Sequence, residues 1–399
     1  MLDTSDVKSL FKKHFASAPT HVVSVPGRVE LLGTHTQAQE GIVISAAIHR
    51  HIQIASAPRT DGRIELVASA FRAGDQFWLT RLNTNPAAPW ADHVKGVLAE
   101  LRRRGAHFSG FNAAIHGTIP MHAGLGSSAA LGLATALTIR ELHPYTLTQT
   151  GVTVPPRRDS RNRLRPLEKA EKFHLASLCQ AAETRFVGVP SGLWDFLPLL
   201  FGKAFHTVHI DCRFLSVDVL PLIGETLVLC DSGSRPEAAG SRLLELHRTL
   251  DSAARKLQSR TLRSVEPAWL KANRSRLTGP EFAHAYHVIG EIQRAVFSES
   301  ALRHDDHRQF GQFMSQSHSS GRDYLRHGSP EAELQITLAS RDPACLGSRL
   351  AGQGFAGATL HLVIHHEVER FMNSIAQSYH HETGRPLTPL LCQITDGIR

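Results

Sequence analysis

Pro120-Met-His-Ala-Gly-Leu-Gly-Ser-Ser-Ala-Ala130 is a short glycine turn that leads directly into a run of small, helix-forming residues. Gly124 and Gly126 allow the main chain to approach an anion closely, because neither residue has a Cβ atom. Ser127 and Ser128 follow where the first N–H groups of a helix lack partners within the helix and can bind phosphate. We therefore predict that this segment binds a nucleotide. The predicted nucleotide-binding residues are Gly124, Leu125, Gly126, Ser127, Ser128 and Ala129.

Two better-known phosphate-binding patterns describe this segment less well. No Gly-Lys-Ser/Thr follows at the spacing of a P-loop. Gly124, Gly126 and Ala129 fit the dinucleotide pattern Gly-x-Gly-x-x-Ala, but that turn directly follows a buried strand, which Pro120 would interrupt. An oxidoreductase would also need an acidic ribose partner after a second strand–helix unit, and no such unit is visible in the sequence. A glycine-rich helix cap without a ligand is the other alternative at this stage.

The length and composition indicate a globular protein. The chain has 399 residues, of which 42% are hydrophobic and 20% are charged, and this is enough for two domains of ordinary size. No apolar run approaches the ~20 residues that span a bilayer, and the first ten residues lack the basic and apolar regions of a signal peptide. We therefore expect a cytoplasmic protein with no membrane partner, either a monomer or a weak dimer.

Charge and residue types narrow the range of ligands. The formal net charge of +8 favours anionic partners, of which ATP is one. Five arginines between residues 155 and 165 come without an aromatic residue for base stacking, so we expect a solvated loop and no nucleic-acid partner. The clusters at 365–367 and 380–382 lack the second histidine of a helical zinc site. Five widely spaced cysteines in apolar surroundings indicate reduced core residues: Cys179, Cys212, Cys230, Cys345 and Cys392.

The pattern of apolar residues predicts an α+β protein of two lobes. Short β-rich runs alternate with turns in the first third of the chain, and helical periodicity follows from about residue 90. The pattern restarts beyond Gly202, so we divide the chain into domains 1–205 and 206–399. Both halves mix helices with strands that we expect to be antiparallel, and a cleft between the lobes is the natural place for a substrate. The predicted strands are 22–25, 41–44, 52–54, 63–67, 206–210, 226–230 and 356–364, and the predicted helices include 90–103, 243–257, 282–296 and 306–317.

Four segments, in this order, resemble the galactokinase branch of the GHMP small-molecule kinases. Pro26-Gly-Arg-Val-Glu-Leu-Leu-Gly-Thr-His-Thr-Gln37 is similar to the signature Pro-Gly-Arg-Val-Asn-Leu-Ile-Gly-Glu-His-Thr-Asp, and 120–130 is similar to the phosphate loop of that family. Residues 180–195 resemble the segment with the catalytic aspartate, and 351–357 resemble the C-terminal glycine motif. The resemblance implies a two-lobed GHMP kinase fold with mixed or antiparallel sheets and the active site between the lobes. It also implies an enzyme that transfers phosphate from ATP to the anomeric C1 hydroxyl of galactose or a closely related sugar.

The resemblance assigns roles to four residues. Ser128 and Glu183 match the magnesium ligands of the family, and a hydroxyl with a carboxylate suits an ion that keeps several waters. Asp195, twelve residues after Glu183, would take the proton of the anomeric hydroxyl. Arg28 would keep Asp195 ionised and offset charge on the transferring group. An ordinary salt bridge for Arg28 and a helix cap for Asp195 are the structural alternatives.

The sugar-binding side of the pattern departs from the family. Thr34-His35-Thr36-Gln37 stands in place of Glu-His-Thr-Asp, so both carboxylates expected to bind sugar hydroxyls are absent, and Arg242 occupies the place of a family tyrosine. Galactose or a close relative, a uronic acid such as galacturonate paired with Arg242, and a catalytically silent sugar and ATP sensor are therefore all open. The residues predicted to bind the sugar are Thr34, His35, Gln37, Gly192, Asp195, Arg242 and Gly354.

Overall fold

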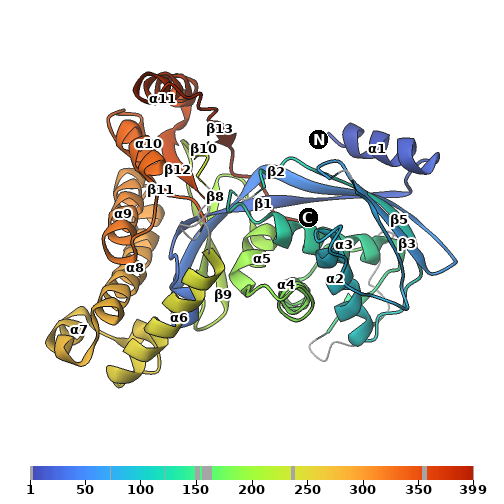
Figure 1. Cartoon of the computed structure of the whole chain (residues 1–399), viewed down its shortest axis with the longest axis horizontal. Helices are drawn as coiled ribbons and strands as arrows, with labels where there is room; N and C mark the ends of the chain where they lie inside the picture. The colour runs from blue at the N-terminus through green and yellow to red at the C-terminus, as the bar shows by residue number, and fades with distance from the viewer. Residues whose placement is uncertain are drawn as a thin grey trace.

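The computed structural model describes residues 3–71, 73–121, 123–148, 153–154, 164–234, 239–352 and 357–398. Figure 1 shows two lobes side by side, one built on a long twisted sheet and the other edged by a layer of long helices. The α+β class and the two-lobed GHMP kinase fold expected from the sequence are confirmed. In the described part of the chain, no helix combines the length and the apolar character that crossing a bilayer requires.

The first lobe is built on a seven-stranded sheet in the order β4-β3-β5-β2-β8-β9, with β1 also paired to β2. The pairs are antiparallel except β3 with β5, which is parallel, so the expectation of antiparallel strands is wrong there. The reason is that the helix between these strands carries the chain back to the edge from which β3 starts. The strands are β1 (His21–Leu32), β2 (Ile42–Pro58), β3 (Arg63–Ala68), β4 (Asp75–Trp78), β5 (Phe111–Gly117), β8 (His206–Asp211) and β9 (Ser216–Pro221).

Helices cover both faces of this sheet. Figure 1 places α1 on one side and α2 to α5 on the other. The helix that follows the glycine loop, α3, is rich in alanine and leucine and is buried around most of its circumference, as expected of a helix enclosed by other elements. The helices are α1 (Ser5–Phe15), α2 (Ala91–Arg103), α3 (Ser127–Leu142), α4 (Lys169–Ala182) and α5 (Leu193–Phe201), with a small ribbon of β6 (Thr146–Leu147) and β7 (Thr153–Val154).

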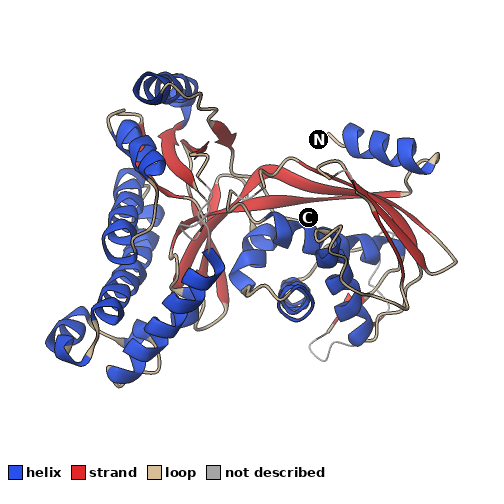
Figure 2. Ribbon diagram, viewed as in Figure 1, coloured by secondary structure: helices blue, strands red, loops and turns tan. Residues whose placement is uncertain are grey.

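The second lobe contains a four-stranded antiparallel sheet in the order β11-β12-β10-β13. Figure 2 shows the helices of this lobe gathered on the outer side of the molecule. The strands are β10 (Glu225–Asp231), β11 (Cys345–Leu350), β12 (Ala358–Ile364) and β13 (Leu390–Cys392), and the helices are α6 (Ala239–Lys256), α7 (Pro267–Ala272), α8 (Gly279–Arg303), α9 (His307–Ser320), α10 (Pro330–Ser340) and α11 (Val368–Thr383). Short turns complete the chain at η1 (Gln37–Gln39), η2 (Glu183–Val187), η3 (Leu262–Ser264), η4 (Arg274–Arg276), η5 (Gly321–Leu325) and η6 (His365–Glu367).

The two lobes share one core. Leu227 and Leu229 of β10 belong to the same hydrophobic cluster as the strands of the first lobe, whereas Val228 between them faces α11, as the alternation of side chains along a strand requires. The division predicted between residues 205 and 206 precedes β8 and β9, which nevertheless pair with the first sheet. The end of the chain also returns to the first lobe, where the N–H of Gly397 donates to the carbonyl of Gly202 at 2.8 Å.

Candidate active site

The glycine loop lies directly over Arg28 of β1. Gly124 and Gly126 have φ angles of 75° and 72°, in the left-handed region that favours glycine. The N–H of Arg28 donates to the carbonyl of Leu125 at 2.9 Å, and a Cβ on Gly126 would lie only 2.8 Å from Cγ of Arg28. Because α3 begins at Ser127, its first N–H groups come immediately after this close approach of Gly126 to Arg28. This is the geometry of an anion-binding helix terminus.

Arg28 and Asp195 are brought together from β1 and α5. The guanidinium Nη2 of Arg28 donates to Oδ1 of Asp195, and Oδ2 of Asp195 accepts from the N–H of Gly192 at 3.0 Å. Burial disfavours the charge on Arg28, but Asp195 and Glu30 outweigh burial and raise its pKa. The salt bridge and the helix cap considered as alternatives are therefore both present, and the aspartate that makes them is also the one predicted to be catalytic.

Glu183 begins η2, a π-helical turn that continues α4. Burial raises the pKa of Glu183, and the nearby hydroxyls of Ser191 and Ser128 offset this only in part. Its Oε1 is buried without a hydrogen-bond partner among the described residues, and the nearest histidine nitrogen, Nδ1 of His93, lies 3.7 Å away. A buried carboxylate oxygen without a donor, beside a serine hydroxyl, fits a hard divalent cation such as Mg²⁺. Ser128 and Glu183 would hold that ion.

The C-terminal glycine motif lies against the phosphate loop. Gly352 has a φ of 59°, and a Cβ there would lie 3.1 Å from Cα of Gly124. The sequence separation of 228 residues gives no sign of this contact, although both segments were singled out by their glycines. Gly354, predicted to bind the sugar, falls outside the described residues.

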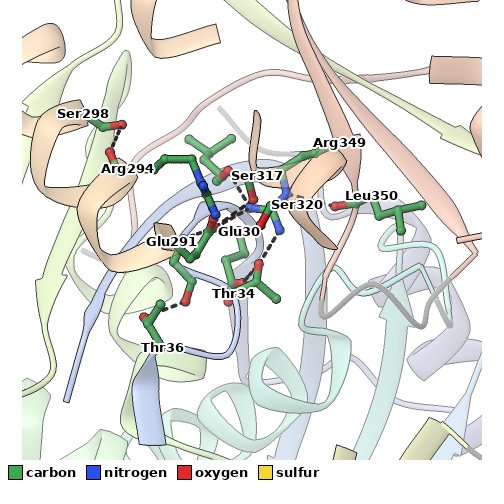
Figure 3. A network of polar contacts seen from close by, with 12 residues as sticks. Glu30, Thr34, Thr36, Glu291, Arg294, Ser298, Ser317, Ser320, Arg349 and Leu350 are labelled. Atoms are coloured by element: carbon green, nitrogen blue, oxygen red, sulfur yellow. Dashed lines mark hydrogen bonds and ion pairs between the residues drawn. The ribbon is translucent and has the colours of Figure 1, made fainter. Parts of the chain in front are cut away.

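The two altered signature residues after β1, Thr34 and Gln37, both contact Glu30, and Figure 3 shows part of this group. The hydroxyl of Thr34 donates to Oε1 of Glu30 at 2.6 Å, and Nε2 of Gln37 donates to Oε2 of the same carboxylate at 3.2 Å. His35 has a left-handed backbone (φ 66°) and its ring packs edge-on against His327, with 5.3 Å between ring centres. Burial, followed by the neighbouring histidines, lowers the pKa of His35 well below its usual value.

A buried ion cluster ties this loop to the second lobe. Arg349 of β11 donates to the carbonyl of Leu31 at 2.7 Å and to the hydroxyl of Thr34. Glu291 of α8 accepts from the N–H of Gly33 at 2.9 Å and pairs with Arg294 at 2.9 Å. Despite full burial, these cations lower the pKa of Glu291 to about 2. Figure 3 shows the two carboxylates and the guanidinium of Arg349 converging on the loop. Sequence spacing carries no signal for this cluster, because its members come from three distant segments.

Arg242 lies beyond the signature loop. It is exposed on α6, where its Nη2 donates to the carbonyl of Arg326 at 3.0 Å. With His327 and Tyr324 it lines a cavity of about 630 Å³. This cavity adjoins the loop through His327, whose ring packs against His35. The pairing of Arg242 with a sugar carboxylate stays a prediction.

A second cavity, of about 540 Å³, opens beside the start of α3. Ser127 and Ser128 line it together with Phe71 and Trp90, whose rings are stacked with 5.6 Å between centres and 5° between planes. Sequence reasoning missed these aromatics. The apolar periodicity places Trp90 at the start of a helix, and nothing in the spacing relates it to Phe71.

Comparisons with known proteins agree on one family. Sequence models described as the galactokinase galactose-binding signature and as the GHMP kinases N terminal domain match residues 9–58 and 92–153. A galactokinase of Roseiflexus sp. is 36% identical over 100% of this chain and 97% of its own length. The galactokinase of Homo sapiens is 32% identical over 99% of this chain and 96% of its own.

Solved structures show the same fold. The crystal structure of Lactococcus lactis galactokinase complexed with galactose matches with a TM-score of 0.85 at 24% identity and covers 98% of both chains. A mevalonate kinase matches with a TM-score of 0.64 at 15% identity, over 94% of this chain and 100% of its own. Together with the full-length sequence relatives, these likenesses show that this sugar kinase belongs to the galactokinase family of the GHMP kinases.

Proposed function

We propose that the protein transfers the γ-phosphoryl group of ATP to the C1 hydroxyl of galactose and releases galactose 1-phosphate and ADP. The observation that carries this proposal is the Arg28–Asp195 pair beneath the glycine loop. A phosphoryl transfer needs an acceptor for the hydroxyl proton and positive charge beside the transferring group, and this pair supplies both. The full-length relatives are galactokinases, which supports galactose as the substrate.

Different residues of the chain carry out different parts of the phosphoryl transfer. Asp195 accepts the proton of the sugar hydroxyl as the oxygen attacks, and the N–H of Gly192 holds the carboxylate in place. Arg28 pairs with Asp195 and stabilises the negative charge that develops on the phosphoryl oxygens. The N–H groups at the start of α3 bind the phosphates. When bound by Ser128 and Glu183, Mg²⁺ supplies charge neutralisation on the phosphates.

The cavity beside α3 is the proposed adenine site. Its apolar wall can stack a base on Phe71 and Trp90 while Ser127 and Ser128 lie where the phosphates enter the loop. Trp90→Ala is expected to raise the KM for ATP about tenfold or more and to leave the KM for galactose unchanged, in steady-state assays at saturating levels of the other substrate. A variant whose two KM values rise together would contradict this placement.

The two alternative functions, a uronic-acid kinase and a catalytically silent sensor, are less well supported. The uronic-acid alternative depended on the absence of negative charge near Thr34 and Gln37, but the carboxylate of Glu30 lies between them and would repel a second carboxylate. The silent-sensor alternative receives no support from the relatives, which are enzymes by name.

The test is phosphorylation of galactose followed by phosphorus NMR, which distinguishes an anomeric phosphate from a 6-phosphate. Asp195→Asn is expected to lower kcat about 10²–10⁴-fold, because the amide cannot take the proton, while its carbonyl can still accept from Gly192. Absence of turnover on galactose in the wild-type protein, or an activity of Asp195→Asn within tenfold of wild type, would overturn the proposal.

A further inference from the structure

The carboxylate of Glu30 lies four residues before a signature position that is glutamate in the family. The family signature has asparagine where this chain has Glu30 and glutamate where it has Thr34. In the structure, the carboxylate of Glu30 accepts from Thr34 at 2.6 Å and from Gln37 at 3.2 Å, the two positions whose carboxylates are absent. This chain therefore has a carboxylate on β1 that contacts both loop positions at which the family signature has one.

Glu30 belongs to the site by its position on β1. It is two residues from Arg28, so both side chains leave the same face of the strand. The two groups also affect each other electrostatically, since Arg28 lowers the pKa of Glu30 and Glu30 raises that of Arg28. A register shift in the pairing of β1 with β2 falls directly after Glu30, between it and Leu32, and such bulges change the direction of neighbouring side chains.

The carboxylate of Glu30 has capacity for another donor. Arg349 donates to the hydroxyl of Thr34, so the single proton of that hydroxyl is directed to Glu30. Gln37 adds one more donor, and a carboxylate offers about four acceptor positions. Only 3% of Glu30 is exposed, and burial raises its pKa. A buried carboxylate served by two neutral donors gains from a third hydrogen bond.

We propose that Glu30 is the specificity-determining residue of the sugar site, where its carboxylate accepts a hydrogen bond from a galactose hydroxyl in place of carboxylates at positions 34 and 37. The proposal rests on the proposed function, since it names the group that recognises the sugar of that reaction. Thr34 and Gln37 then act as positioning residues, which hold the carboxylate rather than the sugar.

The first test is Glu30→Gln, an isosteric change that removes the charge. The KM for galactose is expected to rise about tenfold or more, with the KM for ATP unchanged and kcat within about threefold. Calorimetric titration of galactose measures the ratio of the Kd values of variant and wild type without requiring turnover. Glu281→Gln is the matched control, because Glu281 is 6% exposed and hydrogen-bonded but lies in the second lobe against Lys256. It is expected to leave both KM values unchanged.

Two further measurements separate recognition from a structural role. In a series of monodeoxygalactoses, one analogue lacks the hydroxyl that contacts Glu30. The wild-type protein should bind this analogue about tenfold more weakly than it binds galactose. The Glu30→Gln variant should bind this analogue and galactose with about equal affinity. A purely structural role would weaken galactose and all analogues alike. The reciprocal double variant Glu30→Asn with Thr34→Glu, which restores the family arrangement, should bind galactose at least tenfold more tightly than either single variant.

Outcomes that overturn the proposal are distinct from those that overturn the function. Unchanged galactose affinity in Glu30→Gln, or a double variant no better than its single variants, would overturn the role of Glu30 even if the wild-type protein phosphorylates galactose. If Glu30→Gln does not fold, Glu30→Asp keeps the buried charge and shortens its reach, and the same deoxy series applies. A wild-type protein that binds no galactose would instead refute the proposed function.

Discussion

The carboxylate of Glu183 is held in a position that is unfavourable without a cation. Its Oε1 is buried and lacks a hydrogen-bond partner among the described residues, and burial raises its pKa. A buried charge without a hydrogen-bond partner costs more stability than the neutral amide of the same shape. This residue therefore contributes to ligand binding at the expense of the unliganded protein.

Glu183→Gln is expected to have opposite effects on stability and on activity. The unliganded variant should melt at or above the wild-type temperature, while its activity should need about tenfold or more Mg²⁺ for half saturation. Differential scanning fluorimetry with and without magnesium ATP, and titration of kcat with Mg²⁺, measure the two effects. An unliganded variant that melts well below wild type, with an unchanged magnesium requirement, would show that Glu183 is only structural. Chelation of divalent cations should abolish turnover in the wild-type protein.

Candidate residues that belong to a local motif could be identified from the sequence, and their roles stay predictions. Arg28, Ser128 and Asp195 each lie within a short segment whose pattern constrains one position, and the structure brings the first and the last together. Glu30 could not be predicted in this way. Its neighbours depend on the register shift in β1 and on Arg349, which is 319 residues further along the chain, and sequence spacing carries no information about either.

At the scale of elements, the contact between the C-terminal glycine motif and the phosphate loop sets the geometry of the site. Gly352→Ala places a methyl group 3.1 Å from Cα of Gly124 and strains a left-handed backbone. Because backbone on the opposite side must move, kcat/KM for ATP is expected to fall about tenfold or more.

Gly62→Ala is the matched control, since its φ is 74° and nothing lies within 4 Å of its Cβ position. Both variants should lose about 1 kcal/mol of stability, and only Gly352→Ala should lose activity. Equal activities would contradict a role for the close approach.

An ion pair whose contribution to stability depends on pH connects the start of α9 to β10. Nδ1 of His307 lies 2.7 Å from Oε2 of Glu225, and the adjacent carboxylate raises the pKa of His307 despite opposing burial. A raised histidine pKa stabilises the fold below about pH 6.5, where the unfolded histidine is also protonated, and the contribution is lost as the pH rises through the folded value.

His307→Gln should therefore destabilise the protein more at pH 6 than at pH 9. We expect the difference in unfolding free energy between wild type and variant to shrink by about 1 kcal/mol over this interval, in guanidinium titrations at both pH values. His381→Gln, an exposed change on α11, is expected to show no such dependence. A penalty that is equal at both pH values would mean that the pair is not charged.

Element boundaries were more predictable than element partners. The strand at 63–67 and the helix at 90–103 were expected from period and turn residues, and the structure has them as β3 and α2. The parallel pairing of β3 with β5 and the addition of β8 and β9 to the first sheet were not, because one run of alternating residues can pair in either direction. The π-turn at Glu183 could not be predicted either, because its sequence is indistinguishable from a continuation of α4.

At the scale of the whole molecule, the two lobes are joined by more than the active site. The inward residues of β10 and β12, Phe310 and Met314 of α9 and the strands of the first lobe form one hydrophobic cluster. The buried Arg349–Glu291 cluster crosses the same interface, and the chain end returns to the first lobe. Proteins of this length often unfold lobe by lobe, but a shared core makes the separate lobes unstable.

We therefore expect one cooperative unfolding transition in guanidinium. Trp269→Phe leaves three tryptophans, all in the first lobe, so its fluorescence reports on that lobe, while far-UV circular dichroism includes the helices of both. The two midpoints should coincide in this background. Adding Arg349→Met, which leaves the interface short of one buried cation, should shift both midpoints together by the equivalent of about 3 kcal/mol. A circular dichroism transition that separates from the fluorescence transition would mean that the second lobe unfolds alone, and that the shared cluster does not couple the lobes.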